Sequence, residues 1–405
     1  MTKTPDFNPQ QIQVIMHNDG PCIVVAVAGA GKTTAVVHRI ERLIKQERAK
    51  ESEILATTFT KKAAGEMNER LKALWIDPDK MQVSTFHSVC FSILREERGT
   101  LDVDASGNKS KALLKIVLGY QNLNWNVPYD DIAKFITDCK NSLKKPSDII
   151  EDVNIKYKQA YELFEIKRKQ QGFMTFDDML METYQLFLDE PEVLERWQKQ
   201  FKYVIVDEFQ DTNTAQYELM KMLAYPENNI MVVGDDDQSI YSWRGAVPDY
   251  MLNFQNEFGG SIIRMETNYR CPKIIERIAN PLISNNTKRL SKTLKTHRED
   301  MGIVEVIDSL DFDDVAKRIV SYIKGLPTFE ANNLKQIAVL FRTNAQSRSI
   351  EEVLSSEDIP YDLVSGFNFY DRKEIKDLLL YLIAAYDIDL QGDEALRKIM
   401  NVPFR

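Results

Sequence analysis

The run VVAVAGAGKTT, residues 24–34, constrains the fold more than any other stretch of this sequence. Its apolar first half is rich in β-branched residues and predicts a buried parallel strand, and after Lys32 the apolar positions recur at helical spacing. Glycines between a buried strand and a helix N-terminus favour a loop whose backbone N–H groups bind phosphate. The general pattern of such loops has glycine where this chain has Ala26, so a purely structural strand-turn-helix is the alternative.

Apolar strands and amphipathic helices continue to alternate after this loop. Such alternation is typical of a parallel sheet that helices cover on both faces, which is an α/β fold. Between about His87 and Arg196 the sequence is helix-rich and charged, which indicates a helical insertion between strands. We expect strands at 21–28, 53–59, 81–86, 203–208, 229–235 and 261–267, and helices at 61–75 and 215–224.

A second α/β series follows Pro272. It contains too few strands to close a full sheet before the sequence ends at Arg405, so we expect a partial second domain. The expected strands are 303–309, 336–343 and 361–364, and the expected helices are 314–325, 345–356 and 373–386.

The composition argues against several classes of protein. The formal net charge of -9 argues against coating of duplex DNA by electrostatics alone, but it leaves room for a narrow nucleic-acid groove. No apolar run has the ~18 residues of a membrane span, and the N-terminus lacks a signal-peptide core, so we expect a cytoplasmic protein. The four cysteines are far apart, suggest neither a zinc site nor a disulfide framework, and are expected to be buried: Cys22, Cys90, Cys139 and Cys271.

Two adjacent carboxylates, Asp207 and Glu208, end the strand expected at 203–208. In a doubly wound sheet, ligands bind at the carboxyl ends of the strands. Asp207 is therefore a candidate for holding Mg²⁺, and Glu208 is a candidate for orienting and deprotonating an attacking water. The alternative is an acidic helix N-cap that interacts with the helix dipole.

A third motif, GDDDQSIYSWRG, spans residues 234–245. Its strand again ends in polar groups, among which Gln238 is a candidate sensor of a γ-phosphate. Tyr241 and Trp243 offer ring faces on which single-stranded bases can stack. Aromatic pairs at this spacing also commonly belong to a protein core, which is the alternative.

These motifs, taken in order with Arg270, resemble those of the superfamily 1A DNA helicases of the UvrD, Rep and PcrA type. The resemblance covers essentially the whole chain. In such helicases alanine is common at the position of Ala26, whereas Val27 stands where small residues are the rule. The further motifs that carry the resemblance are FNPQQ (7–11), TTFTKKAAGEMNER (57–70), STFHS (84–88), TFDDML (175–180), TNYR (267–270), VLFRTNAQSR (339–348) and FYDRKEIKD (369–377).

The resemblance implies a RecA-like P-loop NTPase sheet domain with an inserted helical subdomain and a partial second RecA-like domain. The implied domains are a first motor domain (1–88 and 197–272), a helical insertion (89–196), the start of a second motor domain (273–386) and the truncated start of a further insertion (387–405).

The resemblance also implies that ATP and Mg²⁺ are the cofactors. Gln11 matches the glutamine that reads the adenine, Tyr269 matches the aromatic residue that stacks on it, and Arg39 is expected nearby. Lys32 and Thr33 match the lysine and hydroxyl residue of the phosphate loop, and Thr33 is expected to bind Mg²⁺. The remaining cofactor-binding residues of the loop are Ala28, Gly29, Ala30, Gly31 and Thr34.

The implied catalytic residues lie beyond the loop. Asp207 matches the magnesium ligand and Glu208 matches the residue that activates water. Gln238 matches the γ-phosphate sensor, and Arg270 matches an arginine that contacts the γ-phosphate from the domain boundary.

Other matching segments lie along the single-stranded DNA path in the family. For Phe59, Phe86 and His87 a packing role is the alternative, because aromatic residues at strand ends commonly fill the sheet-helix interface. The residues expected on this path are Phe59, Thr60, Thr85, Phe86, His87, Tyr241, Trp243, Arg342 and Asn344.

The function that the resemblance implies is an ATP-dependent helicase that moves 3′ to 5′ on single-stranded DNA. Its implied partners are single-stranded DNA, single-strand/duplex junctions and proteins of repair, recombination or replication. Later motifs of the family have no counterpart here, so we expect a C-terminally truncated form that binds ATP-Mg²⁺ but hydrolyses it weakly. The alternatives are the motor part of a helicase-nuclease and an ATP-binding DNA scaffold, although a scaffold has no need of Glu208.

Overall fold

The computed structural model describes residues 6–119, 128–150, 155–327, 333–364 and 373–386. The chain forms two compact units, Met1–Val304 and Glu305–Arg405. The residues 273–304, which the sequence assigned to a second domain, therefore pack with the first unit. The last expected segment, 387–405, lies outside the described residues.

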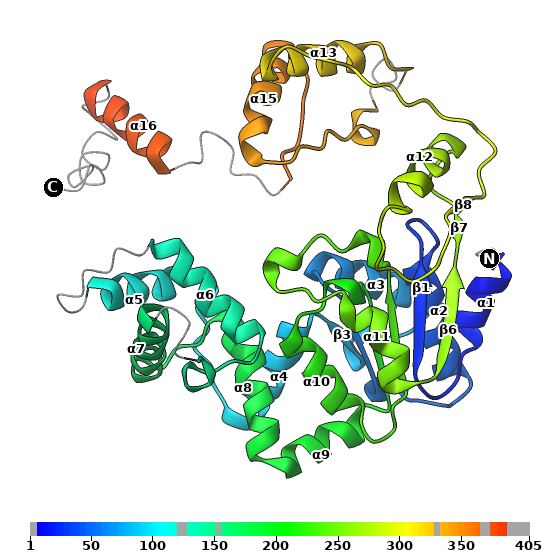
Figure 1. Cartoon of the computed structure of the whole chain (residues 1–405), viewed down its shortest axis with the longest axis vertical. Coiled ribbons are helices and arrows are strands. Elements are labelled where there is room, and N and C mark those ends of the chain that lie inside the picture. The colour runs from blue at the N-terminus through cyan, green and yellow to red at the C-terminus, as the bar shows by residue number, and fades with distance from the viewer. Residues whose placement is uncertain (1–5, 120–127, 151–154, 328–332, 365–372, 387–405) are drawn as a thin grey trace. The chain divides into compact units, whose positions relative to one another are not determined.

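A parallel sheet forms the centre of the first unit (Figure 1). It has six strands in the order β3-β2-β4-β5-β1-β6. All the strands expected in the first part of the chain are confirmed, and neighbouring strands pair in register, for example Val24 with Val233. The strands are β1 (Cys22–Ala26), β2 (Ile54–Thr57), β3 (Gln82–Ser84), β4 (Tyr203–Val206), β5 (Ile230–Gly234) and β6 (Ser261–Met265). The expected α/β class is therefore confirmed.

Successive strand residues point to opposite faces of the sheet, and helices cover both faces, so the residues on both faces are buried. On one face Val24, Ala56 and Ile205 pack beneath α1 to α3, and on the other Val25, Leu55 and Val206 pack beneath α4 and α8 to α11. These helices are α1 (Pro9–Met16), α2 (Lys32–Lys45), α3 (Lys61–Ala73), α4 (Phe86–Arg98), α8 (Phe176–Asp189), α9 (Pro191–Gln200), α10 (Thr214–Ala224) and α11 (Asp249–Phe258).

The helical insertion is divided between two cores. Helices α5 (Asn108–Gly119), α6 (Tyr129–Asn141) and α7 (Ile155–Gln171) have a core of their own. In contrast, α4, α8 and α9 pack on the sheet through residues such as Leu180 and Trp197. The part of the insertion that packs independently of the sheet is therefore narrower than the expected range 89–196.

The first unit contains further elements besides these helices and strands. They are α12 (Lys273–Ile283), β7 (Thr267–Asn268), β8 (Lys295–Thr296), η1 (Glu51–Glu53), η2 (Pro78–Lys80), η3 (Pro146–Asp148), η4 (Phe209–Asp211), η5 (Asp236–Gln238) and η6 (Ser242–Arg244).

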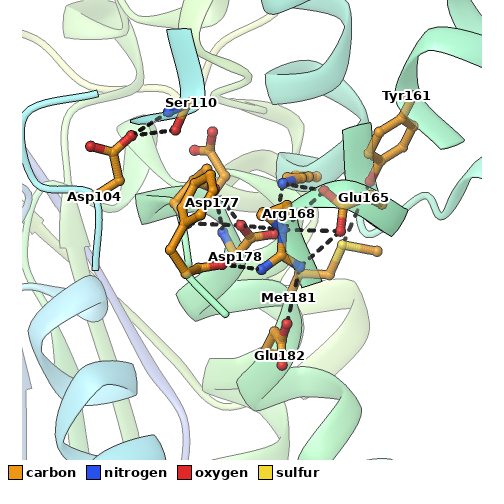
Figure 2. Close-up of polar contacts among 12 residues, drawn as sticks. Asp104, Ser110, Tyr161, Glu165, Arg168, Asp177, Asp178, Met181 and Glu182 are labelled. Atoms are coloured by element: carbon orange, nitrogen blue, oxygen red, sulfur yellow. Dashed lines mark hydrogen bonds and ion pairs between the residues drawn. The ribbon is translucent and has the colours of Figure 1, made fainter. Parts of the chain in front are cut away.

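A buried network of charges joins α6, α7 and α8. The Lys140 ammonium, 1% exposed, lies 2.6 Å from Asp178 and 2.7 Å from Glu165. Figure 2 shows the Arg168 guanidinium between Asp178, Glu165 and Glu182, at 3.1, 2.8 and 3.2 Å. Because each charge has a partner, removal of one cation leaves carboxylates unpaired in a poorly solvated place.

We predict that Lys140→Met destabilises the protein by about 3 to 5 kcal/mol, the usual cost of breaking a buried ion pair. Urea unfolding measures the change. Lys134→Met is the matched control, because Lys134 lies on the same helix with its side chain 66% exposed. Equal stability of the two variants would show that the network contributes nothing.

The second unit contains α13 (Phe312–Lys324), η7 (Leu334–Gln336), η8 (Asn344–Gln346), α15 (Ser347–Ser356) and α16 (Lys373–Tyr386), so its three expected helices are confirmed. Val320 and Leu354 form part of its core. The strands expected at 303–309, 336–343 and 361–364 are wrong for the residues that the structure describes. Apolar alternation forms a strand only beside a partner strand, and Val306 and Leu340 are each 92% exposed here.

Two expectations from composition can be compared with the structure. Cys22, Cys90 and Cys139 are buried as expected, whereas Cys271 is partly exposed. Among the described helices, none is both long and apolar enough to span a membrane.

Candidate functional site

The predicted motifs meet at one edge of the sheet because all six strands are parallel. The loop 27–31 follows β1, the Asp207-Glu208 pair follows β4, and the turn that begins at Asp235 follows β5. Since β5 lies between β1 and β4, these three segments are neighbours at the carboxyl edge.

The loop after β1 depends on two glycines. Gly29 and Gly31 have φ values of +67° and +81°, in the region that disfavours a side chain. A Cβ on Gly29 would lie 2.8 Å from the Cβ of Arg270. Ala26 ends the buried strand, and Val27, 4% exposed, donates its N–H to Met265 at 2.9 Å. The two residues that depart from the general pattern are therefore accommodated by the sheet.

Two of the residues expected around an adenine, Gln11 and Tyr269, are linked through Asn8. Gln11 Nε2 donates to the carbonyl of Ala30 at 3.1 Å, and Asn8 Nδ2 donates to the Tyr269 hydroxyl at 2.8 Å. Asn8 and Gln11 also form a capping box at the start of α1. Tyr269 is 38% exposed, so part of its ring is open to a ligand.

Asn268 is a residue that the sequence reasoning missed. It is fully buried, and its Nδ2 donates to the carbonyl of Ala28 at 2.6 Å. Its Oδ1 accepts the N–H groups of Arg270 and Cys271 at 2.8 and 2.7 Å. Asn268 therefore ties the phosphate loop to the segment that carries Tyr269 and Arg270. A polar residue at the end of the strand 261–267 was the available signal.

Lys32 and Glu208 form an ion pair across the loop, with 3.1 Å between Nζ and Oε2. The Thr33 hydroxyl donates to Asp207 at 3.4 Å. A hydroxyl and a carboxylate are the oxygen ligands that Mg²⁺ prefers, so these two residues fit the ion. Glu208 has a φ of 52°, an uncommon left-handed conformation for a residue with a side chain.

Two carboxyls near this ion pair are difficult to ionise. Burial, and secondly the charge of Glu208, raise the pKa of Asp207 to about 6. The same two causes raise the pKa of Asp211 to about 6, and its Oδ1 is buried without a hydrogen-bond partner. Without a cation beyond Lys32, the site therefore carries more negative charge than its surroundings stabilise.

We predict that Asp207→Asn stabilises the nucleotide-free protein by roughly 3 kcal/mol at pH 7.5. The folded-state pKa is raised, so the stability from protonated Asp207 is complete below pH 4 and is lost as the pH rises through 6. The gain should therefore shrink by pH 5. Urea unfolding without Mg²⁺ tests this, with exposed Asp79→Asn as the control, and a gain independent of pH would contradict it.

A hydrogen-bonded chain connects Gln238 to Glu208. Gln238 Nε2 donates to Asp235 Oδ2 at 2.5 Å, and the Asp235 N–H donates to Gln210 Oε1 at 3.0 Å. Gln210 Nε2 in turn donates to Glu208 Oε2 at 2.8 Å. Gln210, only 2% exposed, was not predicted as a site residue, because nothing local in DEFQD distinguishes it from a core amide.

An aromatic cluster lies near this series of hydrogen-bonded residues. Phe59 stacks on Tyr241 with 4.8 Å between ring centroids, and Tyr241 lies 6.1 Å from Trp243. The Arg244 guanidinium lies 4.7 Å from the Trp243 ring centroid. Trp243 is 60% exposed, so it is not a core residue. The geometry favours an open stacking platform over the packing alternative for Trp243.

A pocket joins this region to the carboxylates. Among its lining residues are Phe59, Thr85, His87, Asp207 and Glu208. Burial lowers the pKa of His87 to about 4, so this side chain is neutral near pH 7 and offers no cation to a phosphate.

Phe86 and two threonines have structural roles. Phe86 is 5% exposed within the sheet-helix core, so the predicted DNA contact of its ring is wrong and the packing alternative holds. Thr60 and Thr85 are the N-caps of α3 and α4, where their hydroxyls accept the N–H groups of Ala63 and Ser88.

The structure contradicts the role expected for Arg39. Its side chain is fully buried, and it donates to the carbonyls of His17 and Asn18 at 3.2 and 3.0 Å. A buried guanidinium that is held by backbone carbonyls is not available to an adenine. The expected contact between Arg39 and the nucleotide is therefore wrong.

Of the remaining predicted residues, Arg270, Arg342 and Asn344 are exposed and Thr34 is partly exposed. The Arg270 side chain faces solvent beside Gly29, and the Thr34 hydroxyl accepts from Arg70 at 3.3 Å. Arg342 and Asn344 are exposed in the second unit. Part of the motif 369–377, namely 369–372, lies outside the described residues.

Comparisons with known proteins agree with these motifs. Residues 7–259 match the family model of the UvrD/REP helicase N-terminal domain, and residues 263–405 match that of the UvrD-like helicase C-terminal domain.

Similar curated proteins include the ATP-dependent DNA helicases PcrA of two Staphylococcus species and of Bacillus subtilis (strain 168). The protein of Staphylococcus aureus (strain NCTC 8325 / PS 47) is 38% identical over 98% of this chain and 56% of its own length. The Bacillus subtilis protein is 38% identical over 98% and 55%, and that of Staphylococcus epidermidis is 37% identical over 99% and 56%. The chain thus spans little more than half the length of these relatives.

Proposed function

Because the chain belongs to the UvrD/REP helicase family, we propose that it is the ATP-hydrolysing motor part of a DNA helicase. The observation that carries this proposal is the arrangement of Lys32, Thr33, Asp207 and Glu208 at the ends of two parallel strands. A phosphate-binding lysine and a carboxylate placed to activate water are what hydrolysis of a nucleoside triphosphate requires.

Each residue of this site has its own role in binding or hydrolysing the nucleotide. Gln11 and Tyr269 hold the adenine, and the N–H groups of the loop bind the phosphates at the start of α2. Thr33 and Asp207 would hold Mg²⁺, and the bound ion would neutralise phosphate charge. Phosphate draws Lys32 away from Glu208, and the freed carboxylate orients and deprotonates water. Gln238 and Arg270 contact the γ-phosphate.

Single-stranded DNA binds to the aromatic cluster in the same proposal. Trp243 and Tyr241 stack bases, while Arg342 and Asn344 of the second unit contact the strand. We further propose movement in the 3′-to-5′ direction and a role in DNA repair, recombination or replication. The support for these two points is the family resemblance of the motifs.

We predict that Glu208→Gln lowers single-turnover ATP hydrolysis by about 10²- to 10⁴-fold, the usual contribution of a general base, while nucleotide affinity is retained. Radiolabelled ATP detects slow turnover, and adding single-stranded DNA should accelerate the wild type. Glu218→Gln, on the surface of α10, is the control. Unchanged hydrolysis in Glu208→Gln would contradict the assignment of Glu208 as the general base. Unwinding of duplexes with a 3′ or a 5′ single-stranded tail tests the direction of movement.

We predict that Trp243→Ala weakens binding of a fluorescent oligothymidine by about 1 to 3 kcal/mol, because one base loses its stacking partner. Trp75→Ala is the matched control, since Trp75 is 96% exposed on the turn after α3. Equal affinity of the two folded variants would return Trp243 to a structural role.

A further inference from the structure

The segment 286–297, which follows α12, contacts two parts of the site at once. Its β8 residues pair with β7, and the His297 N–H donates to the Asn268 carbonyl at 2.8 Å. Its earlier residues, Arg289 to Lys292, contact the acidic turn at 235–237. The segment therefore connects Asn268, which joins the phosphate loop to the segment with Tyr269 and Arg270, to the turn that carries Gln238.

Lys292 occupies the centre of three carboxylates. Its Nζ lies 3.0 Å from Asp235, 2.5 Å from Asp236 and 2.7 Å from Asp237, and its side chain is only 2% exposed. These three carboxylates are close enough together to hold a metal ion. The ammonium group of Lys292 already fills that position, so the cluster contains its own cation.

Arg289 and a backbone group complete the arrangement. The Arg289 guanidinium donates to both oxygens of Asp237, at 2.6 to 3.2 Å, and the Leu290 N–H donates to Asp236 at 2.8 Å. Burial favours protonation of Asp237, but hydrogen bonds from Arg289 and Lys292 lower its pKa below the ordinary value. These contacts stabilise the charged form of Asp237, and two cationic side chains, Lys292 and Arg289, lie among the three carboxylates.

One of these carboxylates also holds Gln238. Asp235 Oδ2 accepts from Gln238 at 2.5 Å, while Asp235 Oδ1 lies 3.0 Å from Lys292 and accepts the Asp237 N–H at 3.2 Å. The direction in which the Gln238 amide points is thus set by a carboxylate that Lys292 fixes. Without the ammonium group, adjacent carboxylates repel and the turn reorganises.

We propose that Lys292 is a positioning residue for ATP hydrolysis, which holds the turn 235–237 so that Gln238 faces the γ-phosphate. The proposal rests on the proposed function, since it assigns a supporting group to the same site. In this role Lys292 contacts the carboxylates of the turn rather than the nucleotide. It acts through Asp235, and it joins the γ-phosphate sensor to the segment that also supports Asn268.

The first test needs no catalysis. Lys292→Met keeps most of the side-chain volume and removes the charge. Hydrogen exchange followed by mass spectrometry should show the amides of Asp237, Gln238 and Leu290 exchanging about tenfold faster or more, with β1 and β4 unchanged. Lys295→Met is the matched control, because Lys295 lies on the same segment with its side chain 67% exposed. Unchanged exchange in Lys292→Met would overturn the proposal.

The second test separates positioning from general damage. Lys292→Met should lower kcat for ATP about tenfold or more while KM and ADP affinity change less than about threefold. In a Gln238→Ala background the same substitution should cause no further loss, since the group on which it acts is gone. Additive losses, or a loss of ADP affinity, would overturn the role of Lys292.

The outcomes distinguish the two proposals. Absence of hydrolysis by the wild type sinks the proposed function and this positioning role with it. Normal hydrolysis by both the wild type and Lys292→Met overturns only the role of Lys292.

Discussion

The parallel pairing of β1 with β5, and of β5 with β4, brings together the three loops that carry Lys32, Glu208 and Gln238. Each strand delivers its loop to the same edge, so Lys32 and Glu208 meet although they are far apart in the sequence. Hydrogen bonds around Gln210 and Asn268 then join the loops laterally. The buried strands supply the apolar stability that allows this edge to hold strained and charged groups, such as Glu208 in a left-handed conformation.

Charge is distributed differently at two neighbouring places on this edge. Beside the phosphate loop, Asp207, Glu208 and Asp211 face one nearby ammonium, and the pKa values of Asp207 and Asp211 rise through burial and the charge of Glu208. Beside β5, three carboxylates have two internal cations. The first place is poised to accept an external cation, whereas the second already holds two cationic side chains of the protein itself. A binding site is expected to leave charge for its ligand to balance, whereas the groups that position it are expected to balance one another.

Local patterns predicted most of the first unit, because strand burial and helical spacing are recorded in a few adjacent residues. Two expectations that came from the family resemblance, the roles of Arg39 and Phe86, conflict with that spacing. Arg39 lies at helical spacing from Val36 and Leu43, and Phe86 from Val89 and Cys90, so both belong to buried faces. Lys292 was beyond prediction because its partners lie far away in the sequence. The strands expected in the second unit did not form because the described residues give them no partner strand. The sequence of a single strand does not specify its partner.

The order of strands in the sheet also affects how the chain reaches its fold. β1 pairs only with β5 and β6, and β2 reaches the rest of the sheet only through β4. During synthesis, the apolar strand at residue 22 therefore has no partner until residue 230 has left the ribosome, after the entire helical insertion. Such distant parallel pairing is slow and leaves apolar segments open to misassociation.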